Sequence, residues 1–151
     1  MTTAGPNGAV ATISNNSWGN LTNGNVYDSY AAMFDGFARD ASAAGSIDPL
    51  LFVFSAGNSG QSGLTRPKMA KNVIAVAASE NLRSTLATQG GSTGVAHNLE
   101  QIPDFSSRGP AADGRVKPDL TAPGAAITGG RSGPSSLFGN IDSVHRHSTG
   151  T

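Results

Sequence analysis

The chain has 151 residues, ten basic and ten acidic side chains, and no cysteine. This balance leaves no basic footprint for nucleic acid or a membrane surface, and the lack of cysteine excludes disulfides and thiolate metal sites. The 20 glycines and the charged content of 13% favour an extracellular sheet-and-loop protein, with one domain as the natural count.

The first half of the chain predicts a strand, a helix and a second strand. Residues 9–13 read as a short strand, and residues 28–44 as a helix with Asp28 as N-cap and Gly45 as its stop. The expected buried helix face is Tyr30, Met33, Phe34, Phe37 and Ala41. The unbroken apolar run 50–54 is typical of a strand buried on both faces, so the unit predicts a right-handed crossover in a parallel sheet.

The second half carries one more clear strand and several loops. Residues 72–78 are a third apolar run, and residues 120–124 resemble a short strand end. Residues 82–102 and 129–139 are expected to be loops, residues 104–124 to be extended and turn-rich, and residues 141–151 to form a polar tail. No apolar stretch reaches the ~18 residues of a membrane span. The polar start is no signal peptide, so an exported parent needs its leader on another segment.

Asn58 follows the central apolar run directly. In open α/β sheets ligands bind beyond the carboxyl ends of the strands, which is where this residue is expected. Its carboxamide offers uncharged N–H donors, and Gly57 and Gly60 allow a close backbone approach. The alternative is that these residues form only a turn.

Six short motifs occur in an order that carries a resemblance. They are Asn16-Ser17-Trp18-Gly19, Ser55-Ala56-Gly57-Asn58-Ser59-Gly60, Asn72-Val73-Ile74-Ala75-Val76, Phe105-Ser106-Ser107-Arg108-Gly109-Pro110, Lys117-Pro118-Asp119-Leu120-Thr121-Ala122-Pro123-Gly124 and Thr149-Gly150-Thr151. Over nearly the whole chain this series resembles the C-terminal part of a subtilisin-like serine protease domain (subtilase, peptidase S8). The loops at 80–83 and 113–115 look most like the bacterial alkaline-protease branch. The expected fold class is therefore α/β: an incomplete, parallel-sheet subtilisin-like domain over residues 1–151.

The resemblance implies roles for two segments of a peptide cleft. Asn58 matches the oxyanion-hole side chain, whose amide stabilises charge that develops in the transition state. The implied substrate-binding residues are Ser17, Trp18 and Gly19 on one wall and Ala56 and Gly57 on the other. The first wall would pair with substrate as an added β-strand. Taken singly, Trp18 reads as a core residue and Gly19 as a turn.

The resemblance also implies a cis peptide bond before Pro67 and a structural cation site beside it. The ligands would be the carbonyls of Lys68, Ala70 and Val73 with the carboxylate of Asp119. Such oxygen ligands suit Ca²⁺ or a monovalent cation, and no cofactor is otherwise required. The alternative is that Asp119 caps a turn or pairs with Lys117 or Arg115.

The family's reacting groups are the clearest departure from the pattern. Serine catalysis needs a hydroxyl, a base and an orienting group, in the chain order Asp, His, Ser in subtilisins. The histidines His97, His145 and His147 lie outside any family motif and are expected on the surface. The family's nucleophile follows Gly-Thr, and Gly150-Thr151 are the last residues here. The sequence therefore predicts a piece of a secreted serine endopeptidase that is inactive alone.

Two further expectations concern partners and alternative functions. A polypeptide substrate is implied, and part of the sheet would lack cover unless the chain self-associates or meets the missing part of its domain. A non-catalytic peptide-binding or assembly module is the main alternative. A nucleotide-binding domain is disfavoured, because the spacing of Gly57, Gly60 and Gly63 is not G-x-G-x-x-G.

Overall fold

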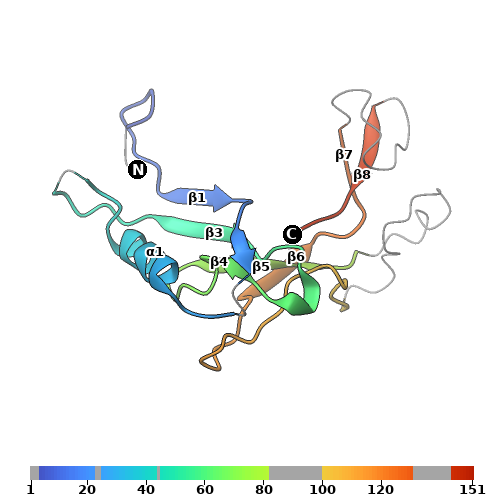
Figure 1. Ribbon diagram of the computed structural model, residues 1–151. Helices are drawn as coiled ribbons and strands as arrows, with labels where there is room; N and C mark the ends of the chain where they lie inside the picture. Colours follow the sequence, from blue (N-terminus) through green and yellow to red (C-terminus); the bar gives the residue numbers. More distant parts are fainter. Residues whose placement is uncertain (1–3, 23–24, 44, 82–99, 131–143) are drawn as a thin grey trace.

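The computed structural model describes residues 4–22, 25–43, 45–81, 100–130 and 144–151. The elements along the chain are β1 (Ile13–Asn16), β2 (Asn20–Thr22), α1 (Ser29–Arg39), β3 (Leu51–Ser55), the 3₁₀ turn η1 (Gly60–Ser62), β4 (Thr65–Arg66), β5 (Ile74–Ser79), β6 (Leu120–Pro123), β7 (Ile127–Gly130) and β8 (His145–Ser148). A four-stranded parallel sheet runs in the order β1-β3-β5-β6 (Figure 1). The predicted α/β class with a parallel sheet is confirmed.

Strand β1 begins later than the sequence predicts. The expected strand was 9–13, whereas the paired residues are Ile13–Asn16, with Ile13 opposite Leu51. Polar Ser14, Asn15 and Asn16 are extended because β3 lies alongside them and satisfies their backbone groups. Backbone pairing with a neighbour therefore overrides the local apolar pattern.

Helix α1 begins where predicted and ends earlier. The Asp28 carboxylate accepts the N–H of Ala31 at 3.0 Å, which confirms the N-cap. The helix stops at Arg39, because the carboxylate of Asp40 accepts the N–H groups of Ser42 and Asp48 and turns the chain. The expected stop at Gly45 is therefore wrong.

The buried face of α1 differs in part from the predicted one. Phe34 is buried as expected, but Tyr30 and Met33 are exposed. Ala31 and Asp35 take the buried positions instead. Asp35 is satisfied there, because it accepts hydrogen bonds from Tyr27 Oη at 2.9 Å and from the N–H of Asn72 at 2.6 Å.

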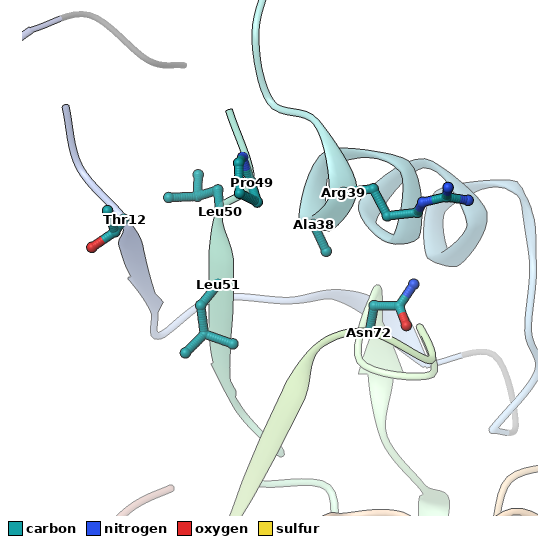
Figure 2. A pocket seen from close by; sticks show the side chains of 7 residues that line it. All are labelled: Thr12, Ala38, Arg39, Pro49, Leu50, Leu51 and Asn72. Atoms are coloured by element: carbon teal, nitrogen blue, oxygen red, sulfur yellow. The ribbon is translucent and has the colours of Figure 1, made fainter. Parts of the chain in front are cut away.

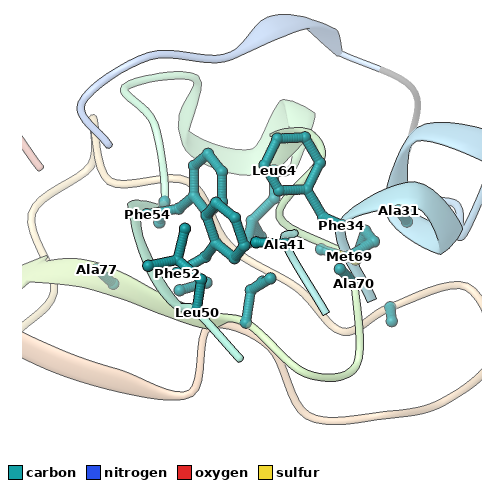
Figure 3. Close-up of a cluster of buried hydrophobic side chains, with 14 residues drawn as sticks. Ala31, Phe34, Ala41, Leu50, Phe52, Phe54, Leu64, Met69, Ala70 and Ala77 are labelled. Atoms are coloured by element: carbon teal, nitrogen blue, oxygen red, sulfur yellow. The ribbon is translucent and has the colours of Figure 1, made fainter. Parts of the chain in front are cut away.

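The core lies between α1 and one face of the sheet (Figure 3). The Phe34 ring meets the rings of Phe52 and Phe54 edge-on, with centroids 5.0 and 5.3 Å apart. On the other face of β3, Leu51 is 40% exposed and Val53 is half-buried. The burial on both faces that the apolar run predicts is therefore met on one face only.

That second face, the uncovered face, continues across the neighbouring strands. Register places Ile13 opposite Leu51, Val53 opposite Ile74 and Val76 opposite Leu120. Ile13, Leu51 and Leu120 are all exposed. In the part of the chain that the structure describes, α1 is the one α-helix and it packs on the opposite face. The part of the sheet that the structure describes thus has no helix on this side, in agreement with the expectation that part of the sheet would lack cover.

The last part of the chain contains strands that the sequence does not predict. β7 includes Gly129 and Gly130, which were expected in a loop, and β8 lies in the expected polar tail. The two strands pair antiparallel, from Ile127 opposite Ser148 to Gly130 opposite His145. Most of the predicted 82–102 loop, including His97, and residues 131–139 lie outside the described residues. Within the described ranges, no helix has the length and apolarity needed to cross a bilayer.

Candidate active site

Asn58 lies just beyond the carboxyl end of β3, where its side chain is exposed. Its Oδ1 accepts hydrogen bonds from the N–H and the hydroxyl of Thr151, at 3.1 and 3.2 Å. The N–H of Gly57 also donates to the Thr151 hydroxyl, at 3.0 Å. The end of the described chain, which returns from β8 (Figure 1), is thus held against the Asn58 loop.

The orientation of the Asn58 carboxamide determines which of its hydrogen-bonding groups are available to a ligand. Because Oδ1 is the atom that faces Thr151, the Nδ2 donors have no hydrogen-bond acceptor among the described residues. Nδ2 lies on the Gly150 side, 3.7 Å from where a Cβ on Gly150 would be. An amide with its acceptor engaged and its donors open is suited to binding a negatively charged or carbonyl oxygen.

Ser107 is hydrogen-bonded to the residues on either side of Asn58. Its hydroxyl accepts the N–H of Ser59 at 3.0 Å, and its own N–H donates to the carbonyl of Gly57 at 2.9 Å. The side chain is fully buried. The sequence identified Ser107 only as part of a motif and missed this supporting role, since a serine before an Arg-Gly-Pro turn carries no local sign of its distant partner.

Trp18 stands at the edge of the core. Its ring meets the Phe54 ring edge-on at 5.3 Å and the Phe34 ring at 6.0 Å, while half of the side chain remains exposed. Its indole N–H donates to Asn16 Oδ1 at 3.1 Å. Trp18 therefore packs one side of its ring on the core, as the single-residue interpretation predicts, and leaves the rest at the surface. Its neighbours Ser17 and Gly19 are exposed.

The two predicted walls meet at the ammonium group of Lys68. A Cβ on Gly19 would overlap the Thr65 hydroxyl and lie 2.7 Å from Lys68 Nζ. A Cβ on Gly57, which has a φ of 107°, would lie 3.4 Å from the same Nζ. Both positions therefore need glycine, and Ala56 beside them is fully buried. The structure thus brings the predicted walls together, with a cationic group between them that the sequence had assigned only as a carbonyl ligand.

Lys68 is 2% exposed. Its Nζ donates to the Thr65 hydroxyl at 2.5 Å. Burial lowers the pKa of Lys68 to about 8, because the desolvated site disfavours the charged form.

A second buried ammonium occupies the place expected for a cation. Lys117 Nζ donates to the carbonyl of Val73 at 2.9 Å and to Asp119 Oδ2 at 2.7 Å. Asp119 Oδ2 also accepts the N–H of Ala75 at 2.7 Å. The pairing of Asp119 with Lys117, which the sequence left open as an alternative, is present. A metal ion does not fit these oxygens as they stand, because it would have to displace a positively charged group.

Other features bear on the expected site. The Arg66–Pro67 bond is cis, as predicted. His145 is exposed on β8, as expected of a surface histidine. Among the described residues no group of three or more His, Asp or Glu is arranged to hold a metal ion.

The structure has hollows at both ends of the sheet. Figure 2 shows one of about 510 Å³ at the amino end of β3, between that strand and the last turn of α1. It carries no predicted site residue, and its position is opposite to the ligand-binding end of a parallel sheet. A hollow of about 190 Å³ at the carboxyl ends is lined by Asn15, Ser17, Val53, Phe54, Ser55, Val76 and Thr151.

Comparison with known proteins matches residues 4–149 to the Subtilase family, peptidase S8. A stretch of 36 residues is 56% identical to the serine protease/ABC transporter B family protein tagD of Dictyostelium discoideum and spans 24% of this chain and 2% of that protein. The related protein tagB of the same organism is 53% identical over 36 residues, with the same shares.

Two solved structures share the fold. The Prenylagaramide maturation protease PagA has a TM-score of 0.55 at 23% identity, over 95% of this chain and 38% of that one. Sphericase has a TM-score of 0.52 at 23% identity, over 93% of this chain and 38% of its own. This chain therefore spans well under half of either structure. The family match over almost its whole length shows that the chain belongs to the Subtilase family.

Proposed function

We propose that this chain is the part of a subtilisin-like serine endopeptidase domain that carries the oxyanion donor and the substrate walls, and that it does not cleave peptides alone. The observation that carries the proposal is the Asn58 carboxamide, exposed at the carboxyl end of β3 with its acceptor engaged and its donors open. Donors fixed in this way act on the oxygen that becomes negative when a peptide carbonyl is attacked.

The substrate in this proposal is an extended polypeptide. Ser17, Trp18 and Gly19 are exposed and follow directly on β1, so their backbone can pair with an added peptide strand. Such pairing binds many sequences, since it uses main-chain groups that all peptides share.

The acid–base and nucleophilic groups are proposed to come from polypeptide outside these 151 residues. Support comes from the coverage of 38% of the solved structures. It also comes from the lack of any family histidine motif around His97, His145 and His147. The parent is proposed to be a secreted enzyme of the bacterial alkaline-protease branch, and this chain the C-terminal part of its catalytic domain.

No cofactor is proposed for this part of the enzyme. The resemblance implied a Ca²⁺ or monovalent cation at Lys68, Ala70, Val73 and Asp119, but an ammonium contacts the oxygens of Val73 and Asp119. We propose that Lys117 does in this chain what a bound cation does in relatives.

Trp18 makes the cleft testable, since it is the one tryptophan of the chain and half of it is exposed. Titration with an extended peptide amide should give a saturable change in its fluorescence. A serine-reactive phosphonate should not label the chain. The absence of any fluorescence response would contradict the cleft, and labelling would contradict inactivity.

A second candidate is a non-catalytic peptide-binding or assembly module. The uncovered face favours it, because the neighbours Ile13 and Leu51 are exposed there and Leu120, opposite Val76 two strands further along, is exposed as well. Self-association, or docking of the missing part of the domain, would bury them. Sedimentation of a clean monomer with a cooperative melt would count against assembly and leave the first proposal standing.

A further inference from the structure

The Lys68 ammonium lies where the proposed substrate walls approach each other. Its Nζ is close to both Gly19 and Gly57, at the distances given above for a Cβ on either residue. Glycine at both positions brings backbone close to this atom, where any other residue would place a side chain. The charged end of Lys68 is thus the chemical group that a side chain held between these walls would meet.

Lys68 is poorly partnered for a buried cation. An ammonium carries three N–H donors, and among the described residues only the Thr65 hydroxyl accepts from it. The ion pairs of the described residues join Asp28, Asp104, Asp113 and Asp119 to other cations. A lysine that is only 2% exposed and has no carboxylate partner among the described residues has a large unmet demand for an anion.

We infer that Lys68 selects a substrate whose residue before the cleaved bond carries an acidic side chain. The inference rests on the proposed peptide cleft and adds the substrate class. A carboxylate would accept the open donors of Lys68 in charge-assisted hydrogen bonds and would neutralise its charge.

Other side chains lose part of this interaction. Glutamine has the shape of glutamate and an acceptor oxygen but no charge, so it tests the electrostatic part alone. Leucine would leave the ammonium buried without a partner, and a lysine would place two like charges together. The expected order of affinity is Glu, then Gln, then Leu, with Lys last.

The structure allows a contrary interpretation, in which Lys68 fills the space between the walls and only glycine or alanine is accepted. The two interpretations predict different results, because a Lys68 side chain that fills this space would exclude glutamate and leucine alike. The peptide set therefore needs an alanine member.

The experiment is a fluorescence titration of Trp18 in the intact chain at pH 7, with acetyl-Ala-Ala-Pro-Xaa amides in which Xaa is Glu, Gln, Leu, Ala or Lys. We expect the Glu peptide to bind about tenfold more tightly than the Gln peptide, with the Leu peptide weaker still. Equal affinities for Glu, Gln and Leu, or a preference for Ala, would overturn the acidic selectivity and leave the cleft intact. No response to any peptide would overturn the proposed function as well.

Two variants make the assignment specific to one residue. Lys68→Met keeps the length of the side chain and removes the charge, so the preference for Glu over Gln should vanish. Lys71→Met is the matched control, because Lys71 is an exposed lysine close by in the chain. It should keep the preference. Retention of the preference in Lys68→Met would overturn the inference, and if that variant does not fold the ranking of peptides by the wild-type chain still decides.

Discussion

Lys68 and Lys117 are both buried, at 2% and 5% exposure, and the fold compensates their buried positive charges in different ways. Lys117 Nζ meets the carboxylate of Asp119 and the carbonyl of Val73. Lys68 Nζ meets only the hydroxyl of Thr65 among the described residues. The first charge is therefore neutralised within the fold, and the second is left for a ligand to neutralise. The difference separates a lysine that supports structure from one suited to binding.

The largest effect is expected at Lys117. Lys117→Met should lower the free energy of unfolding by about 3 kcal/mol, because breaking a buried pair leaves Asp119 uncompensated. This is the lower end for buried pairs, since the Asp119 side chain is 35% exposed. Denaturant unfolding measures it, with Lys71→Met as control, which loses only an exposed cation–π contact with Tyr27 and should stay within about 1 kcal/mol of wild type. A loss no larger than the control's would show that the pair contributes nothing.

Lys117→Ala, which replaces the lysine with a short side chain, tests whether the Lys117 ammonium takes the place of a bound cation. It frees the oxygens of Val73 and Asp119, so added K⁺ or Ca²⁺ should restore part of the lost stability. The wild-type chain should not respond to either ion beyond a sodium control at equal ionic strength. An equal response of both proteins would contradict the replacement.

Lys68 should respond in the opposite direction. Lys68→Met removes a desolvated charge without orphaning a carboxylate, so the free energy of unfolding should rise by about 1–2 kcal/mol. The same unfolding series measures it. Destabilisation comparable to that of Lys117→Met would erase the proposed distinction between the two lysines.

A pH series sharpens the comparison further. Because the pKa of Lys68 falls from 10.5 in the unfolded chain to about 8 in the fold, the folded chain binds fewer protons between these values. The contribution of Lys68 to stability is thus least favourable below pH 8 and improves as the pH rises to 10.5. The difference in unfolding free energy between wild type and Lys68→Met should shrink across this window. A constant difference would argue against a depressed pKa.

The smallest effect on stability is expected at Asn58. The residue is exposed, so Asn58→Ala should change the free energy of unfolding by no more than about 0.5 kcal/mol. A loss of several kcal/mol would identify Asn58 as a structural residue and weaken its assignment as an oxyanion donor.

Local pattern was sufficient to predict much of the fold. The apolar run that becomes β3, the Asp28 cap and the strand Ile74–Ser79 all follow from nearby residues. The β7–β8 pair and the start of β1 could not be predicted from nearby residues, because each depends on pairing with a strand that is distant in the sequence. Polar residues such as Asn15 form strand when a neighbour satisfies their backbone.

The candidate site was predictable in its motifs and not in its electrostatics. The roles of Asn58 and the two walls are predictions from the sequence, and the structure places Gly19 and Gly57 close to one ammonium. Nothing in the local sequence says that Lys68 points between the walls or that Lys117 meets Asp119, because both depend on side-chain paths through the folded core. Lysine is rarely buried, so local sequence predicts neither the burial of these two lysines nor their partners.

The most direct test of the central claim is a titration of lysine ¹³Cε signals by NMR, with the Lys68 signal assigned from Lys68→Met. In the free chain the midpoint of the Lys68 signal should lie near pH 8. Saturation with acetyl-Ala-Ala-Pro-Glu amide should raise that midpoint, because a bound carboxylate favours the charged form, while the Leu peptide should not. A Lys68 midpoint that no peptide moves, or that the Glu and Leu peptides move equally, would contradict the claim that this ammonium faces the substrate.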